Sequence, residues 1–166
     1  MSDIKLQYIA SSAVTISLAS LATDSNLLAG RESTAIDNSS NEYLDYLLAG
    51  QITQGTSPTT AKEIRVYVVG MLNDSTWPDV FDGTDSAETV TSSGIRDSVC
   101  RLAAVMATDA TSDRVNYFGP VSVAALFGGT VPPKFVVFVT HNTAVNLNST
   151  AGNHVISITP VHHQIV

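Results

Sequence analysis

The densest group of side chains that could do chemistry is a run of four carboxylates within ten positions. Asp79, Asp82, Asp85 and Glu88 recur at every third residue, with Gly83 among them. Clustered carboxylate oxygens bind Ca²⁺ in proteins, but an EF-hand loop places its ligands at alternate positions. Asp also favours turns, because its side chain accepts hydrogen bonds from nearby backbone N–H groups. We therefore expect turns and caps in this segment, with a Ca²⁺ site as the minor alternative.

Four histidines form a second group, late in the chain: His141, His154, His162 and His163. The adjacent His162 and His163 point to opposite faces of a strand, so they cannot easily share one metal ion. His141 and His154 can face each other across a hairpin if their strands pair. No cysteine accompanies them at zinc-like spacing. We expect hydrogen-bonded or interface histidines and neither a metal nor another cofactor.

The sequence carries no local signature of an enzyme. Ser, His and Asp are numerous, but the Gly-x-Ser-x-Gly nucleophile elbow is missing. Gly128 and Gly129 are not followed by the Lys-Ser/Thr of a phosphate-binding loop. The single cysteine, Cys100, lies in an apolar run, which favours a buried structural thiol. We therefore expect a protein that is not an enzyme.

Composition excludes further classes of function. Charged residues make up 14% of the 166-residue chain, well below the quarter that is usual for soluble domains, and hydrophobic residues make up 44%. The net charge of -7 and the lack of clustered Lys and Arg argue against a nucleic-acid partner. No apolar run is long enough for a membrane span, and the first ten residues do not resemble a signal peptide. The lone cysteine is compatible with synthesis in a reducing cytoplasm.

The elements that must position these residues are mostly short strands. Residues 63–72 form the clearest one, because they are β-branched and aromatic. Residues 43–53 show a helical leucine spacing, but their Asn/Ser-rich flanks favour a strand bulged at Gly50. Residues 95–107 fit a helix or a strand, and the β-rich neighbours favour the strand. Further strands are expected at residues 14–21, near 36, 115–118, 135–141, 143–147 and 154–161, and a long irregular loop at 73–88.

Eight to ten short strands predict an all-β fold, an antiparallel β-sandwich of jelly-roll type. Residues 13–166 are expected to form this single domain, and residues 1–12 an extended arm that is ordered only against a neighbour. A jelly roll buries its inner faces within itself, so surplus aromatic side chains become candidates for subunit contacts. We name Tyr43, Tyr46 and Phe127 as those candidates.

Four strings carry a resemblance to a known family: LLAGRESTAIDN at 27–38, DGTDSAET at 82–89, FGPVSV at 118–123 and VTHNT at 139–143. With them the chain resembles a family of small virion proteins of tailed bacteriophages, over about residues 18–160. The strings are not catalytic motifs, and the resemblance carries over no site residues.

The resemblance implies a decoration or cement protein on the outer surface of the capsid, made in the host cytoplasm and bound to the major capsid protein. It also implies a homo-oligomer, for which we expect a trimer, because icosahedral shells offer local three-fold positions. The acidic charge agrees with a place outside the shell, away from packaged DNA. The alternative is a tail- or fibre-associated jelly-roll module that binds host carbohydrate through aromatic residues with Asp or Asn beside them. An enzyme that acts on the cell wall would require paired acidic residues in a cleft.

Overall fold

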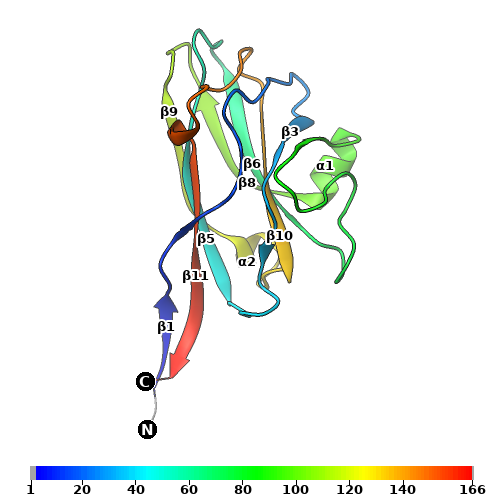
Figure 1. The fold of residues 1–166 in the computed structure, drawn as a ribbon, viewed down its shortest axis with the longest axis vertical. Helices are drawn as coiled ribbons and strands as arrows, with labels where there is room; N and C mark the ends of the chain where they lie inside the picture. Colours follow the sequence, from blue (N-terminus) through cyan, green and yellow to red (C-terminus); the bar gives the residue numbers. More distant parts are fainter. Residues whose placement is uncertain (1–2, 166) are drawn as a thin grey trace.

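Two antiparallel β-sheets pack face to face in the computed structural model, which describes residues 3–165 (Figure 1). Sheet A consists of β1 (Ile4–Tyr8), β2 (Ser12–Ala13), β5 (Asp45–Thr53), β9 (Val115–Ser122) and β11 (Val155–Ile165). Sheet B consists of β3 (Ala29–Glu32), β4 (Ile36–Asp37), β6 (Lys62–Gly70), β7 (Ala87–Thr89), β8 (Cys100–Thr108) and β10 (Lys134–His141). The connections contain α1 (Ser93–Val99), α2 (Val123–Leu126) and a short 3-10 helix, η1 (Ala151–Asn153). The predicted antiparallel β-sandwich is confirmed.

The strand pairings link distant parts of the chain. Sheet A runs in the order β1, β11, β5, β9, with β2 also on β11, and sheet B in the order β7, β3, β10, β6, β8, with β4 also on β10. Early strands therefore pair with late ones: β2 with β11, β3 with β10, β5 with β9, and β6 with β8.

Within the described residues, no helix is long and apolar enough to span a membrane.

The main hydrophobic core lies between the two sheets. It is built from alternate residues of the paired strands, such as Leu48 of β5 and Ile158 of β11 on one side and Val66 and Val137 of β6 and β10 on the other. Successive side chains of a strand point to opposite faces, so each strand contributes every second residue to this layer. Leu48, Val66 and Val137 are completely buried.

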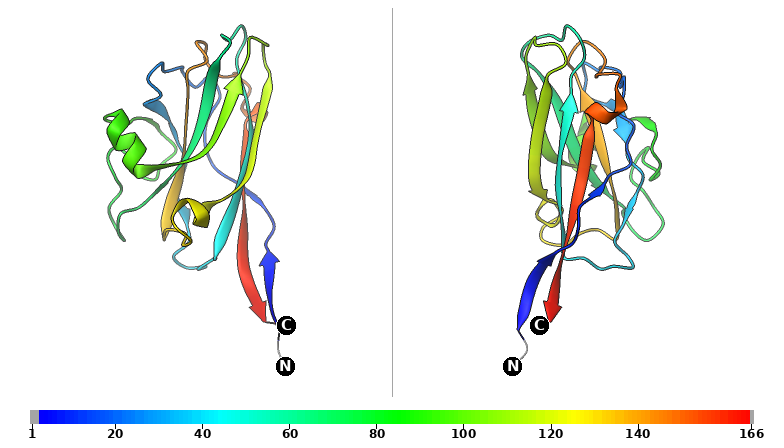
Figure 2. Two further views of the ribbon diagram at one scale, coloured as in Figure 1. Left: turned by 180° about the vertical axis from the view of Figure 1, so that it is seen from behind. Right: turned by 60° about the vertical axis from the view of Figure 1, so that its left-hand side comes forward.

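A second core lies on the outer face of sheet B. The segment between β6 and β8, residues 71–99, folds back over this face and carries α1 with it (Figures 1 and 2). Tyr67 and Phe138 point outward from the sheet and pack with Phe81 and Val90 of the segment. Sheet B is thus covered on both faces. This explains why the sequences of β6 and β10 are nearly continuous apolar runs rather than alternating ones.

Three expected strands differ in the structure. Residues 14–21 follow β2 as irregular chain, in which Val14 and Leu18 are buried but the backbone forms no ladder. Residues 143–147 also form no strand, because Thr143 bonds its own neighbour Val145 and the segment turns through Ala144 at positive φ. Residues 95–107 are neither all strand nor all helix: α1 ends at residue 99 and β8 begins immediately after it.

The strand expected at residues 43–53 is confirmed as β5, with its bulge. The register between β5 and β9 shifts between Leu48 and Gly50. A side chain at Gly50 would place its Cβ 2.4 Å from the carbonyl oxygen of Val155, so only glycine fits this close approach to β11.

The two ends of the described chain form a two-stranded ribbon. β1 pairs with the last residues of β11, from Tyr8 opposite Val161 to Ile4 opposite Ile165. The ribbon projects from one end of the sandwich, beyond the other strands of sheet A (Figures 1 and 2). The expectation that the arm is ordered only against a neighbour is wrong for residues 4–8, because their partner strand belongs to the same chain. Residues 1 and 2 of the expected arm lie outside the described residues.

Candidate functional site

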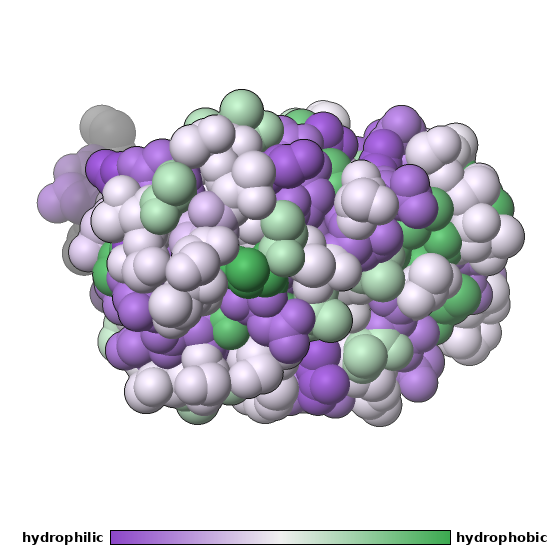
Figure 3. All heavy atoms as spheres, turned by 90° about the horizontal axis from the view of Figure 1, so that it is seen from above, coloured by the Kyte–Doolittle hydropathy of each residue, from purple (hydrophilic) through white to green (hydrophobic). Residues whose placement is uncertain are grey.

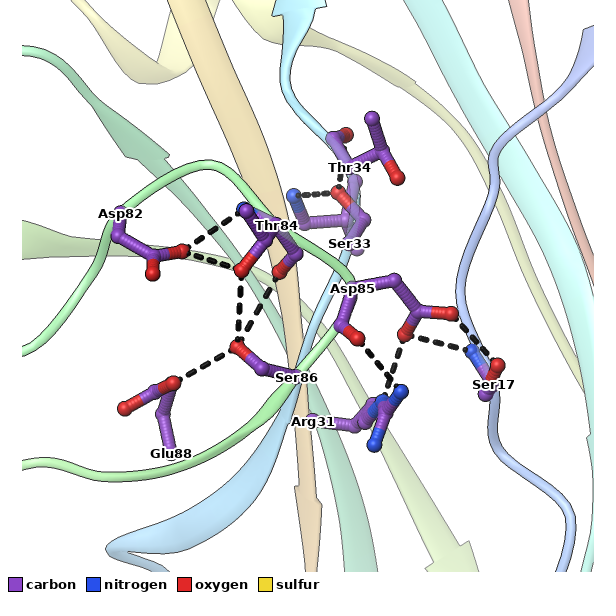
Figure 4. A network of polar contacts seen from close by, with 10 residues as sticks. Ser17, Arg31, Ser33, Thr34, Asp82, Thr84, Asp85, Ser86 and Glu88 are labelled. Carbon is purple, nitrogen blue, oxygen red and sulfur yellow. Dashed lines mark hydrogen bonds and ion pairs between the residues drawn. The ribbon is translucent and has the colours of Figure 1, made fainter.

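The four carboxylates of the acidic run serve separate local roles. Asp79 accepts hydrogen bonds from the backbone N–H of Thr91 at 2.9 Å and from its hydroxyl at 2.6 Å. Asp82 accepts corresponding bonds from Thr84 at 2.8 and 2.6 Å (Figure 4). These bonds from the Thr84 hydroxyl and N–H hold the pKa of the Asp82 carboxyl below its ordinary value. Asp82 is thus a turn-forming side chain, and Asp79 ties the start of the run to Thr91, twelve residues later.

The other two carboxylates of the run, Asp85 and Glu88, accept hydrogen bonds from different partners. Asp85 bridges Arg31, whose Nε lies 2.6 Å away, and the N–H and hydroxyl of Ser17. Burial raises the pKa of Asp85, but the bonds from Arg31 and Ser17 outweigh it and leave the pKa below the ordinary value. Glu88 accepts a bond from the Ser86 hydroxyl (Figure 4). Across residues 3–165 no three His, Cys, Asp or Glu side chains are grouped to hold a metal ion, so the candidate Ca²⁺ ligands are not brought together.

Glu32, which sequence reasoning did not single out, is the most unusual acid of the protein. It lies in β3, its side chain is completely buried, and its carboxylate accepts hydrogen bonds from the backbone N–H groups of Gly83 at 2.7 Å and Asp82 at 3.2 Å. Burial raises its pKa to about 7. The carboxyl fastens the acidic loop to sheet B, but it has no surface at which a substrate could reach it. The sequence of β3, Ala29 to Glu32, shows no apolar alternation that could have indicated this burial.

The two inner histidines are structural. His141 is fully buried, and its ring nitrogens lie 3.0 Å from the hydroxyl of Thr143 and 3.0 Å from the carbonyl oxygen of Leu21. His154 lies 2.8 Å from the carbonyl oxygen of Asn148. Burial lowers the pKa of both rings, which favours the neutral form. The hairpin that would pair their strands is absent, because His141 ends β10 in sheet B and His154 precedes β11 in sheet A.

One of the aromatic candidates for subunit contacts is a core residue. Tyr46 is 2% exposed, its hydroxyl donates to Oδ1 of Asn38 at 3.0 Å, and its ring packs edge-on against Phe135. The prediction for Tyr46 is therefore wrong: the inward face of β5 buries it. Tyr43 and Phe127 are partly buried against the same core, which leaves only their outer edges available to another molecule.

A hollow of about 520 Å³ lies between the loop before β5 and the segment that leads into β10. Its lining includes the apolar Leu44 and Val131 and the acidic Glu42 and Asp74. Tyr43 is the single aromatic residue among those that line it. One aromatic ring with carboxylates beside it meets the expected pattern of a carbohydrate site only in part.

The ribbon itself has two chemically different sides. In an antiparallel pair, opposite residues share a face, so Ile4, Leu6 and Tyr8 lie on the same side as Ile165 and His163. We call this side the ribbon apolar face. Its hydrophobic side chains are 53–73% exposed: Ile4 69%, Leu6 53%, Tyr8 58% and Ile165 73%. The other side is polar, with Lys5, Gln7, His162 and Gln164.

The ribbon apolar face is the strongest candidate for a functional surface. An isolated two-stranded ribbon is marginal in water, and an exposed row of apolar side chains marks an interaction site. At the opposite end of the sandwich, by contrast, hydrophobic residues are scattered among hydrophilic and neutral ones (Figure 3). The alternation of Ile4, Leu6 and Tyr8 with polar residues was the sequence signal for this face.

Comparison of the chain with models of known protein families, with curated proteins and with solved structures finds no match.

Proposed function

We propose that this protein is a structural, non-enzymatic virion protein that decorates the outer surface of a tailed-bacteriophage capsid, and that its sandwich is a jelly roll. A jelly roll arises when a long antiparallel ribbon is rolled up, so that early strands pair with late ones. The pairs β2–β11, β3–β10, β5–β9 and β6–β8 support this topology. Jelly rolls occur in viral capsid proteins and in lectins, an analogy that covers the fold alone.

The observation that carries the proposal is the ribbon apolar face. Its exposed side chains, Ile4, Leu6, Tyr8 and Ile165, project beyond the sandwich and lack a cover within the described chain. A decoration protein needs such an element, because it must attach to a shell that is already closed. In the proposed role this face docks on the major capsid protein.

The charge of the chain fits the same role. A net charge of -7 disfavours contact with packaged DNA and suits the outside of the shell. No motif in the sequence and no metal cluster among residues 3–165 offers chemistry that competes with a structural role. The homo-oligomer expected from the sequence is part of this proposal.

The test is attachment to phage heads that lack the protein, taken from the virus that encodes it. Removal of residues 1–8 is expected to leave the sandwich folded, since residues 4–8 pair only with residues 161–165 at the end of β11. We expect the truncated chain to melt like the full chain but to fail to sediment with heads. Leu6→Asp is expected to weaken attachment, whereas the matched variant Gln7→Asp, on the polar side of the same strand, keeps it.

Two results would contradict the proposal. One is equal attachment of Leu6→Asp and Gln7→Asp. The other is immunogold labelling of intact particles that finds the protein on the tail or not at all. Labelling over the head surface, together with a difference between the two variants, supports it.

The alternative function is carbohydrate binding by a tail or fibre module. The hollow at Tyr43, with Glu42 and Asp74 in its lining, is the observation that favours it. This function predicts binding of the purified chain to host surface glycans and loss of that binding in Tyr43→Ala. Retention on heads without any glycan binding favours the decoration role instead.

A further inference from the structure

The outer face of sheet A is the one broad face of the sandwich that the described chain leaves open. Residues 71–99 cover the corresponding face of sheet B and build a second core there. Along β5 the residues that point outward are Leu47, Ala49 and Gln51, because Leu48 and Ile52 point into the main core.

The cross-strand register assigns the other members of this face. Gln51 lies opposite both Tyr117 of β9 and Val155 of β11, and Ala49 lies opposite Ser157. We call the following set the sheet A face: Ala13, Leu47, Ala49, Gln51, Tyr117, Val155, Ser157 and Thr159. The set contains no charged residue, in a chain with 23 charged residues, 15 acidic and 8 basic.

One carboxylate borders this face, and it already has partners. Asp45, at the first position of β5, accepts hydrogen bonds from the hydroxyl of Ser122 at 2.6 Å and from the N–H of Ala124 at 2.8 Å. It therefore lies at the end of the face near α2, where neighbouring donors hold its side chain in place, and not within the face itself.

A projection and a recess lie side by side on the sheet A face. Tyr117 is 72% exposed, although it stands in the middle of an antiparallel strand pair. Beside it is a hollow of about 200 Å³ lined by Gly50, Gln51, Val155 and Tyr117 itself. Tyrosine is enriched among the residues that dominate binding at protein interfaces, where it fills a pocket on the partner.

We propose that two copies of this chain pair through their sheet A faces about a two-fold axis, each Tyr117 entering the hollow of the other copy. A two-fold interface brings the same patch of both subunits together, so it requires a projection and its matching recess on one face. The uncharged face also selects a second copy: two chains of net charge -7 repel each other least where neither presents a charge. The pairing deepens the proposed function, and it replaces the expected trimer by a dimer.

The size of the face limits the strength of the contact. Its members span five residues along β5 and β11 and lie on four strands, which at ~3.3 Å per residue and ~4.8 Å between strands gives a patch of about 16 by about 15 Å. Its area is about 250 Å² by that estimate, below the ~800 Å² per partner of a standard interface. The free chain is therefore expected to dimerise weakly, with a dissociation constant on the order of 10–100 µM. Neighbouring attachment points on a shell raise the effective concentration and complete the pairing there.

The test is the mass of the purified full chain in sedimentation equilibrium from about 1 µM to about 1 mM. We expect a shift from one chain of 17.5 kDa to twice that mass. Tyr117→Asp, which places a charge at the side chain that enters the partner's hollow, is expected to weaken dimerisation by about 30-fold or more. Leu72→Asp, at a similarly exposed residue away from the face, is the matched control and keeps the dimer. Melting curves show that both variants fold.

A wild-type chain that stays a monomer throughout, one that forms a trimer, or a dimer that Tyr117→Asp leaves intact each overturns the proposal. These outcomes are separable from those of the decoration role. If Leu6→Asp abolishes head attachment while Tyr117→Asp leaves the dimer intact, the decoration role stands and the two-fold pairing fails. If instead Tyr117→Asp abolishes the dimer while Leu6→Asp leaves head attachment unchanged, the two-fold pairing stands and the decoration role fails.

Discussion

Replacement of Glu32 by Gln tests how the acidic loop is held on sheet B. The Glu32 carboxyl is completely buried and faces the N–H groups of Gly83 and Asp82. Burial is the main reason that its pKa is raised, from 4.5 to about 7, and the nearby Asp82 and Glu88 carboxylates add to the effect. A neutral side chain of the same shape removes this titration while it keeps an oxygen that can accept from Gly83.

The sign and size of the effect follow from linkage. Because folding raises the pKa of this acid, the protonated form is favoured in the folded state. Its contribution to stability is therefore complete below pH 4.5, declines as the pH rises, and is lost above about pH 7. A difference of about 2.5 pH units at ~1.4 kcal/mol per unit corresponds to an upper limit of about 3.5 kcal/mol.

The assay is urea unfolding of the wild type and of Glu32→Gln at intervals between about pH 5 and about pH 8. We expect the free energy of unfolding of the wild type to fall relative to that of Glu32→Gln by up to about 3 kcal/mol over this range. Glu42→Gln, which removes an exposed carboxyl from the loop before β5, is the control and follows the wild type. Parallel curves for the wild type and Glu32→Gln would refute the assignment of a raised pKa to this carboxyl.

Three further predictions concern the second core, the acidic run and the buried thiol. Phe138→Ala is expected to lower the free energy of unfolding by about 3–5 kcal/mol and to expose residues 71–99 to limited proteolysis, because Phe138 is fully buried beneath Phe81; an unchanged proteolysis pattern contradicts this. EDTA is expected to leave the melting temperature unchanged, since the carboxylates at 79–88 bond separate partners; a drop that Ca²⁺ reverses contradicts this. Burial raises the pKa of Cys100 to about 12, so we expect Ellman's reagent to react with it only after unfolding, and rapid reaction of the native chain would contradict this.

The sequence predicted the central strands well and the connections poorly. The apolar runs of β6 and β10 are long and β-branched, so their identity does not depend on distant contacts. Residues 14–21 show the same alternation, yet they form no strand. Their apolar residues do fill the core, but the ladder position beside β11 is taken by β2 and β5. Periodicity reports which side chains are buried, and it does not report which backbone groups find a partner.

The candidate surfaces were harder to predict than the fold. Of the acidic run, Asp82 forms the expected turn with Thr84, two residues on, whereas Asp79 and Asp85 bond residues 12 or more positions away, which the sequence did not indicate. The ribbon was missed, because β1 gains its partner strand from residues more than 150 positions later. Tyr46 was misplaced for a related reason: the face of β5 that points inward depends on the register with β11, which one strand alone does not reveal.

The pairing of early with late strands also governs when the protein can fold. β11 is a central strand of sheet A, between β5 and the pair β1 and β2, and it leaves the ribosome after every other described strand of the sandwich. Until then β1 and β2 have no partner and the main core lacks Ile156 and Ile158. Pairing over such a separation is slow, since the intervening chain must be ordered first. A nascent chain that stops short of Val155 would lack both a closed sandwich and the ribbon. Such truncated products would then be unable to compete with intact chains for positions in the proposed assembly.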